Sequence, residues 1–332
     1  MIVRKIIGGR QLATVHSKNK GMFLVIISTI LWAINGNIGA YLFKYKEITP
    51  GHLTFYRLIF TGLILIIYEF ITNRSEVFSI FKNKKESLIL IYFAFFGALT
   101  MQYSYFVAIQ YSNAATATTL QNLSPFIIVV ITSIWYRKLP SKNIILSLGL
   151  ALVGAFLIVT HGKFNQLAIT KPALVFGLLA SIGYVNYTLS PISLQAKYNT
   201  SLIMGWAMLL AGIGFGFVFN PMGSTIIMDS ITILSFGYVI ILGTLFPFLF
   251  YSLGVKNAGA QIASILSLIE PVASAIIGVI FLGESFKRID LIGISLVICA
   301  LYLLSKGKKT PDKSSELRNF KIYENNLKIL NK

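Results

Sequence analysis

Ten apolar stretches alternate with short polar connectors along the chain. A transmembrane α-helix needs about 20 residues, because each residue rises 1.5 Å and the hydrocarbon core of a bilayer is about 30 Å thick. The sequence therefore predicts an all-α integral membrane protein of ten transmembrane helices. We place them near residues 22–43, 51–71, 88–109, 113–136, 143–160, 173–193, 200–220, 232–254, 257–282 and 288–305.

Composition and charge support this prediction. The chain is 55% hydrophobic and 12% charged, whereas a soluble domain carries about 25% charged residues. Its net charge of +18 is no sign of nucleic-acid binding, because Lys and Arg lie in connectors and in both tails. Basic residues gather on the cytoplasmic side of membrane proteins. We expect a multi-pass protein of the cell membrane with both termini in the cytoplasm.

The third and fourth stretches match the eighth and ninth at a constant separation of 146 residues. The matched positions pair Gly97 with Gly243, Tyr105 with Tyr251, and Pro125 with Pro271. Each half holds an odd number of spans, so the second copy must cross the membrane in the opposite sense. We predict two inverted five-helix repeats, 22–160 and 172–305, between basic tails at 1–21 and 306–332. Chance similarity between apolar segments is the alternative.

These matched segments also carry a family resemblance. The stretches YSNAATATTLQNLSP (111–125) and VKNAGAQIASILSLIEP (255–271) resemble the fourth and ninth spans of the drug/metabolite transporter superfamily, EamA type. The resemblance implies ten helices in two inverted halves, a central cavity, and export or exchange of metabolites. One departure is Lys138, which stands opposite Glu284 in the repeat alignment, where the family often has a glycine–glutamate pair.

Two charged residues lie well inside the predicted spans, Arg57 and Glu270. Charges within the bilayer are costly and commonly face a partner or a wet cavity. Arg57 lies near one end of its span, so its side chain either contributes to a site or extends to the membrane surface. Glu270 is either a coupling carboxylate or substrate contact, or a structural acid bonded to backbone groups that Pro271 leaves free.

Helical spacing extends the candidate cavity. Thr118, Gln121 and Pro125 share one helix face, and Ser264, Ser267 and Pro271 repeat that face in the second half. Helix packing through small residues is the alternative explanation. Amide and aromatic residues within the spans add further candidates. The expected substrate-binding residues are Asn35, Arg57, Tyr103, Thr118, Gln121, Asn186, Tyr187, Ser264, Ser267 and Glu270.

Sequence motifs of enzymes, metal sites and cofactor sites are not found. The chain has no GxSxG, HExxH or phosphate-binding loop, so we expect no catalysis, no cofactor and no direct use of ATP. The sequence favours a secondary transporter of a small polar metabolite that works by alternating access. A membrane-embedded enzyme or a lipid-handling protein is the alternative, and formation of a homodimer is left open.

Overall fold

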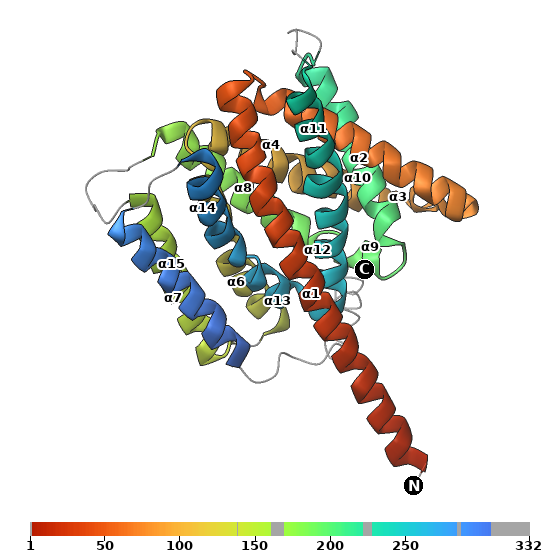
Figure 1. Cartoon of the computed structure of the whole chain (residues 1–332). Coiled ribbons are helices and arrows are strands. Elements are labelled where there is room, and N and C mark those ends of the chain that lie inside the picture. The colour runs from red at the N-terminus through yellow and green to blue at the C-terminus, as the bar shows by residue number, and fades with distance from the viewer. Residues whose placement is uncertain (1, 138, 161–168, 222–227, 284–286, 307–332) are drawn as a thin grey trace.

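The computed structural model describes residues 2–137, 139–160, 169–221, 228–283 and 287–306, and all regular structure in them is helical (Figure 1). The first part of the chain contains α1 (Ile2–Tyr45), α2 (Pro50–Thr72), η1 (Arg74–Glu76), η2 (Ser79–Lys82), α3 (Lys84–Tyr92), η3 (Phe93–Leu99), α4 (Thr100–Gln110), α5 (Ala114–Gln121), α6 (Ser124–Tyr136) and α7 (Lys142–Thr160). The second contains α8 (Lys171–Leu189), α9 (Ile192–Gln195), α10 (Thr200–Val218), α11 (Ser230–Ile240), η4 (Ile241–Leu245), α12 (Phe246–Ala258), α13 (Ala260–Leu266), α14 (Ile269–Leu282) and α15 (Arg288–Lys306). Lys138, Glu284 and the tail after Lys306 lie outside the described residues.

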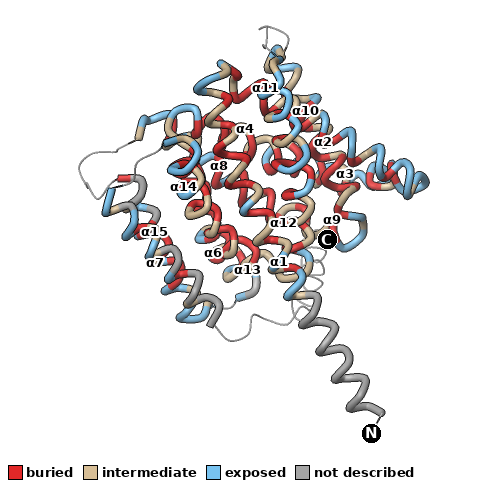
Figure 2. The backbone as a smooth tube through the Cα atoms, in the orientation of Figure 1, coloured by how far each residue is buried: buried red, intermediate tan, exposed pale blue. Residues whose placement is uncertain are grey.

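Among the described residues, eight helical stretches are long and apolar enough to cross a membrane, and α7 adds a shorter apolar stretch, Lys142–Gly154. Buried residues face the interior of the bundle and exposed residues its periphery (Figure 2). Large apolar side chains stand on that periphery, including Phe217 at 89% exposure and Leu234 at 73%. A soluble protein rarely exposes so many of them together. This surface suits the hydrocarbon of a bilayer.

Several predicted spans are interrupted helices. The third and eighth contain the π-helical segments η3 and η4, in which the backbone pairs over five residues. The fourth breaks at Asn122 and Leu123, between α5 and α6, and the ninth breaks between α13 and α14. The ninth begins at Ala260, later than residue 257, because Gly259 has a φ of 93° that favours glycine and ends α12.

Helix boundaries in the two parts of the chain share one register. The starts of α4 and α12, of α5 and α13, and of α7 and α15 are each 146 residues apart, and so are the ends of α6 and α14 and of α7 and α15. A π-helical segment precedes α4 and another precedes α12. The separation found in the sequence therefore recurs in where the helices begin and end.

The two parts of the chain interlock. The helix α1 packs against α12 and α14, α2 against α10, and α4 against α8. Glycines permit the closest approaches. A Cβ atom at Gly62 would lie 2.6 Å from the backbone nitrogen of Leu209, and one at Gly183 would lie 2.7 Å from Cα of Met101. The helices α7 and α15 pack mainly on each other at the side of the bundle (Figure 1).

Candidate functional site

A pocket inside the bundle gathers polar and charged side chains from both parts of the chain. We call it the central pocket. It is lined by Trp32, Asn35, Arg57, Met101, Gln102, Tyr105, Gln121, Phe248 and Glu270. These residues come from α1, α2, α4 and α5 on one side and from α12 and α14 on the other. The empty space in the pocket, counted together with the space that opens from it, is about 260 Å³.

Arg57 enters the pocket from α2 and is 2% exposed. Its Nε donates to Oγ1 of Thr244 at 2.9 Å, and Nη2 donates to the carbonyl of Gly243 at 3.4 Å. The guanidinium carbon lies 4.7 Å from the ring centre of Phe106 and 5.6 Å from that of Phe248. The Nη1 atom is buried without a hydrogen-bond partner. The side chain is therefore fixed in place, but part of its hydrogen-bonding capacity is unused.

Glu270 enters the same pocket from the first turn of α14 and is 1% exposed. Its Oε2 is also buried without a partner. Arg57 and Glu270 form no direct ion pair, because among the described residues the ion pairs within 4.0 Å involve other side chains. The pocket thus contains one basic and one acidic side chain that form no ion pair with each other.

Uncharged groups around these two residues are also unpaired. They include Nε1 of Trp32, Oδ1 of Asn35 and both amide atoms of Gln102. Buried polar groups in proteins nearly always have partners. Several unsatisfied donors and acceptors around one cavity are what a polar ligand requires. Gly243 keeps room for Asn35, since a Cβ atom there would lie 2.7 Å from the Asn35 Cγ.

Aromatic rings support one wall of the pocket. Trp32 lies 5.0 Å from Phe248 and 5.3 Å from Tyr251, measured between ring centres. Tyr187 lies behind them and donates from its hydroxyl to the carbonyl of Phe248 at 3.1 Å. Edge-on and tilted contacts of this kind give a rigid surface. The wall therefore supplies fixed apolar area next to the polar groups.

The structure brings together some of the predicted site residues. Asn35, Arg57, Gln121 and Glu270 all line the central pocket. The interpretation of Arg57 as a side chain that extends to the membrane surface is wrong, because it is buried and directed inward.

Two other predicted residues lie away from the pocket. Tyr103 packs its ring against Phe176 and Phe215. Asn186 accepts a hydrogen bond from the Tyr92 hydroxyl at 2.8 Å, in an exposed position. Asn35 and Asn186, both expected at the substrate site, therefore do not share one cavity.

The remaining candidates are buried behind the pocket lining. Thr118 pairs with the Tyr105 hydroxyl at 3.0 Å, and Ser267 donates to Oδ1 of Asn122 at 3.1 Å. Tyr187 supports Phe248, as described above, and Ser264 donates to the carbonyl of Gln261 at 3.0 Å. The predicted common face fails because α5 ends at Gln121, so Pro125 turns away from Gln121. These residues support the lining or hold the helix breaks together.

Sequence reasoning missed three members of the site, which are Met101, Gln102 and Phe248. Gln102 offered a signal, because an amide in the middle of an apolar stretch is uncommon. Tyr105 was noted for its match with Tyr251, and its position in the lining is new. A carboxylate near the end of α2, Glu69, was also overlooked, although it is only 1% exposed.

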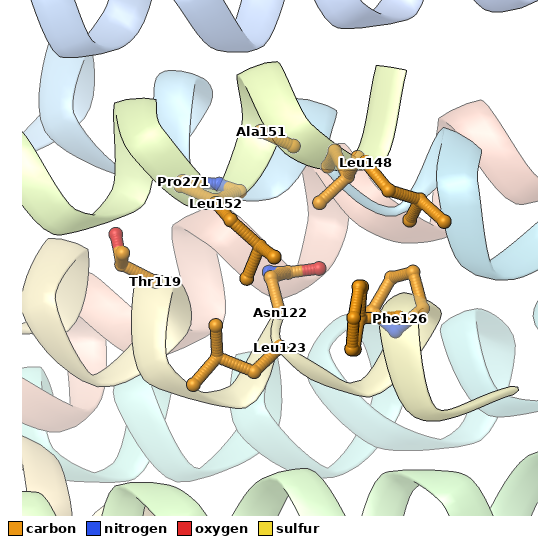
Figure 3. A pocket seen from close by; sticks show the side chains of 10 residues that line it. Thr119, Asn122, Leu123, Phe126, Leu148, Ala151, Leu152 and Pro271 are labelled. Atoms are coloured by element: carbon orange, nitrogen blue, oxygen red, sulfur yellow. The ribbon is translucent and has the colours of Figure 1, made fainter. Parts of the chain in front are cut away.

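A second cavity, which we call the lateral cavity, lies between the broken helices and α7. It is lined by Thr119, Asn122, Leu123, Pro125, Phe126, Leu148, Ala151, Leu152, Leu268 and Pro271 and has about 390 Å³ of empty volume. Figure 3 shows Leu148 and Leu152 reaching from α7 towards Leu123 and Phe126. Its walls are mainly apolar. The amide of Asn122 is already bonded to the carbonyl of Thr118 and to Ser267.

Polar clusters connect the two parts of the chain at opposite ends of α2. Just before α2, Lys46 forms an ion pair with Asp229, the residue that caps α11. At the other end, Glu86 of α3 accepts from Lys197 and from the Tyr198 hydroxyl, which lie between α9 and α10. The helix between them has 23 residues, or about 35 Å at 1.5 Å per residue.

The charge state of the Lys46–Asp229 pair is stable around neutral pH. Hydrogen bonds from Lys46 and Thr232 hold the pKa of the Asp229 carboxyl well below its usual range, and the same carboxylate raises the pKa of Lys46. In the other cluster, burial and the neighbouring Glu86 raise the pKa of Tyr198 to about 12. The Tyr198 hydroxyl therefore remains a proton donor to Glu86.

Comparison with known proteins agrees with the arrangement of the chain in two similar parts. The model of the EamA-like transporter family matches twice, over residues 19–160 and 171–306. The chain belongs to the EamA-like transporter family. Within this family it is 36% identical over 289 residues to an uncharacterized inner membrane transporter, YicL, of Salmonella typhimurium, with 87% of this chain and 96% of that protein covered.

More distantly similar proteins also match over most of this chain. The riboflavin transporter ImpX of Fusobacterium nucleatum is 21% identical to this EamA-like chain, with 86% of this chain and 98% of ImpX covered. A solved crystal structure has the same fold, with a TM-score of 0.66 at 13% identity over 86% of this chain and 96% of that one. The EamA-like protein is thus a multi-pass membrane transporter of small molecules and not an enzyme.

Proposed function

We propose that the protein is a secondary transporter, an exporter or exchanger of a small polar metabolite, and that it works by alternating access to the central pocket. The observation that carries the proposal is a buried pocket between the two parts of the chain, in which Arg57 and Glu270 have unpaired polar atoms. Sites near the interface of two repeats are common in secondary transporters. One distant relative is named for a polar metabolite, riboflavin.

Two inverted five-helix repeats, 22–160 and 172–305, form the proposed framework. The shared 146-residue register of the helix boundaries and the twofold match of the family model support it. In this arrangement α7 and α15 are the fifth and tenth spans, and both termini are cytoplasmic. A reporter that is active only outside the cell, fused after Lys332, should stay silent, and strong activity there would contradict the ten-span topology.

The polar clusters at the two ends of α2 are the proposed gates. In the inverted arrangement, the Lys46–Asp229 pair closes the external side and the Glu86–Lys197–Tyr198 cluster closes the cytoplasmic side. Both clusters are formed at once, and the pocket between them is small. These features correspond to an occluded state. Transport then requires each cluster to open in turn.

Glu270 is the proposed coupling group, because it is the acidic side chain in the lining of the pocket. A carboxylate at this depth costs about 2.5–3.5 kcal/mol when unpaired, so proton binding and substrate binding each relieve the same cost. A carrier coupled in this way needs no nucleotide.

The deciding experiment uses the purified full chain in sealed proteoliposomes loaded with a small-molecule extract of the source cells. Mass spectrometry of the external medium should show release of at least one polar metabolite without nucleotide, faster than from protein-free vesicles. Release that requires ATP, or no release above the protein-free level, would refute the proposal. The lipid-handling alternative has no support beyond the apolar walls of the lateral cavity, and the family assignment excludes the enzyme.

A further inference from the structure

We propose that the connector between α2 and α3, residues 73–85, binds the headgroups of anionic phospholipids at the membrane surface. The inference goes beyond the proposed transport function and takes from it only the topology, which places this connector at the cytoplasmic leaflet. The observation behind it is a group of exposed basic side chains directly after the end of α2, next to exposed aromatic rings. The basic residues are Arg74, Lys82, Lys84 and Lys85.

The connector is folded onto the bundle. The side chains of Val77 and Ile80 are fully buried beneath it. Nε1 of Trp206 in α10 donates to the carbonyl of Val77 at 2.8 Å, and the hydroxyl of Ser87 in α3 donates to the carbonyl of Ile80 at 3.3 Å. The backbone that carries the basic side chains is therefore held in a defined place at the edge of the bundle.

Two aromatic side chains of the connector are exposed beside these cations. Phe78 is 57% exposed and Phe81 is 37% exposed, and their ring centres lie 5.5 and 4.9 Å from that of Trp206. Trp206 is the seventh residue of α10 (Thr200–Val218), so it lies about 9 Å from the start of that helix at 1.5 Å per residue. Aromatic rings gather at this depth, where headgroups meet hydrocarbon. The rings thus place the connector in the headgroup layer.

The charge of the connector is not balanced within the protein. Among the described residues, no ion pair within 4.0 Å involves any of the four basic side chains. Arg74 instead lies over the ring of Phe70, 4.9 Å from its centre. Glu76 is the acidic residue of the connector, so four basic residues and one acidic residue leave a local charge of +3. Four or more basic residues next to a membrane span attract anionic lipids, by about fivefold for each cation.

The apolar surroundings favour a lipid over a soluble anion. Exposed apolar side chains continue from the connector along both helices, with Ile71 of α2 at 78% exposure and Leu88 of α3 at 57%. A soluble anion would contact the cations alone. A phospholipid places its phosphate beside the cations and its acyl chains against the rings and these apolar side chains. Because α3 also carries Glu86, the bound lipid holds the helix that forms part of the proposed cytoplasmic gate.

The test follows the fluorescence of Trp206, because its ring lies against both phenylalanines. Trp32→Phe and Trp135→Phe leave Trp206 as the single tryptophan of the full chain. The protein is reconstituted in equimolar phosphatidylglycerol and phosphatidylcholine, and either lipid carries brominated acyl chains, which quench tryptophan on contact. Brominated phosphatidylglycerol should quench Trp206 more strongly, with an association constant at least about fivefold above that of phosphatidylcholine. The preference should vanish in 1 M salt, where charges are screened within about 3 Å.

Matched variants assign the preference to this connector. Lys84→Gln with Lys85→Gln should lower it at least about fivefold. Arg137→Gln with Lys142→Gln removes the same charge from another connector on the same proposed side and should leave the preference within about twofold. Glu76→Gln should raise it. If the chain with one tryptophan fails to fold, Tm of the protein with its natural tryptophans is measured in detergent against each added lipid, with the same two double variants.

Two outcomes overturn the proposal. Equal association of the two lipids at low salt would show that the connector has no anionic-lipid site, and equal losses in the two double variants would assign the preference to general surface charge. Release of metabolites from loaded proteoliposomes is measured in parallel. If release persists without a lipid preference, only the lipid site is wrong. If the preference is found and release fails, the transport function is wrong and the lipid site stands.

Discussion

The central pocket and the lateral cavity are neighbours with opposite properties. Gln121 and Glu270 line the first, and the next residues along the chain, Asn122 and Pro271, line the second. The walls of the lateral cavity are mainly apolar, and the Asn122 amide already has partners. The central pocket contains several unpaired polar atoms. Unsatisfied polarity therefore distinguishes the candidate site.

The largest expected effect is that of Glu270→Gln. The amide keeps the shape but removes the titrating charge, so transport should fall at least ~30-fold at unchanged membrane abundance, in line with loss of a buried charged contact of 2 kcal/mol or more. Any residual transport should be independent of pH between about 5 and 8. The measurement is initial transport rate against external pH, matched for protein. A curve that superimposes on the wild type would make Glu270 a structural acid.

Gln102→Ala should have an intermediate effect. Both amide atoms of Gln102 lack protein hydrogen-bond partners, so the hydrogen bonds that its removal eliminates are those with the substrate. One or two hydrogen bonds of about 0.5–1.5 kcal/mol each correspond to a roughly 2- to 150-fold rise in KM. Asn186→Ala is the matched amide outside the pocket and should leave KM unchanged. Equal effects of the two substitutions would remove the distinction between these positions.

A substitution in the lining of the lateral cavity should lower the stability of the protein and leave its transport rate nearly unchanged. Leu148 is 6% exposed and lines this cavity. Leu148→Ala enlarges it, and such truncations cost about 2–5 kcal/mol in soluble proteins, of which the loss of packing also applies within a bilayer. We expect a lower Tm in detergent, with transport per folded molecule within about twofold of wild type at low temperature. A selective rise in KM would place this cavity on the substrate path.

The smallest effect concerns the Lys46–Asp229 ion pair. Because Lys46 lowers the pKa of Asp229, the contribution of this pair is present above the usual carboxyl pKa of about 3.9 and is lost only as the pH falls below it. The raised pKa of Lys46 preserves the pair up to high pH. Asp229→Asn should thus change the height of the pH–rate curve but not its shape between about pH 5 and 8. A changed shape would assign pH sensitivity to this end of α2.

Eight of the ten predicted membrane-spanning stretches are confirmed among the described residues. They could be predicted because the hydrocarbon core imposes a length and a polarity that can be read locally. The sequence located Arg57 and Glu270, since charges within apolar stretches are conspicuous. It left the direction of Arg57 open, because hydropathy does not show that η4 offers Thr244 as an acceptor.

The direction in which a side chain points around its helix was predicted less well. The shared face of Thr118, Gln121 and Pro125 assumed a continuous helix, and the break after Gln121 removes that basis. The break itself involves local backbone hydrogen bonds, such as Leu123 to Leu120 at 3.2 Å, which do not alter the apolar pattern. Neither π-helical segment has a signature in the hydrophobic pattern. Residues such as Gln102, which lies just beyond η3, therefore had no reliable predicted direction.

The two π-helical segments also affect which changes in length the chain can tolerate. In an α-helix, deleting one residue rotates everything beyond the deletion by about 100° relative to the preceding turns. A π turn already contains one surplus residue. Deleting one residue within η4 would restore ordinary α pairing and leave α11 and α12 facing their original neighbours, while the same deletion within α12 would turn Tyr251 away from Trp32. At η3 and η4, a membrane span can thus lose one residue without rotating the helix on one side of the deletion relative to the helix on the other side.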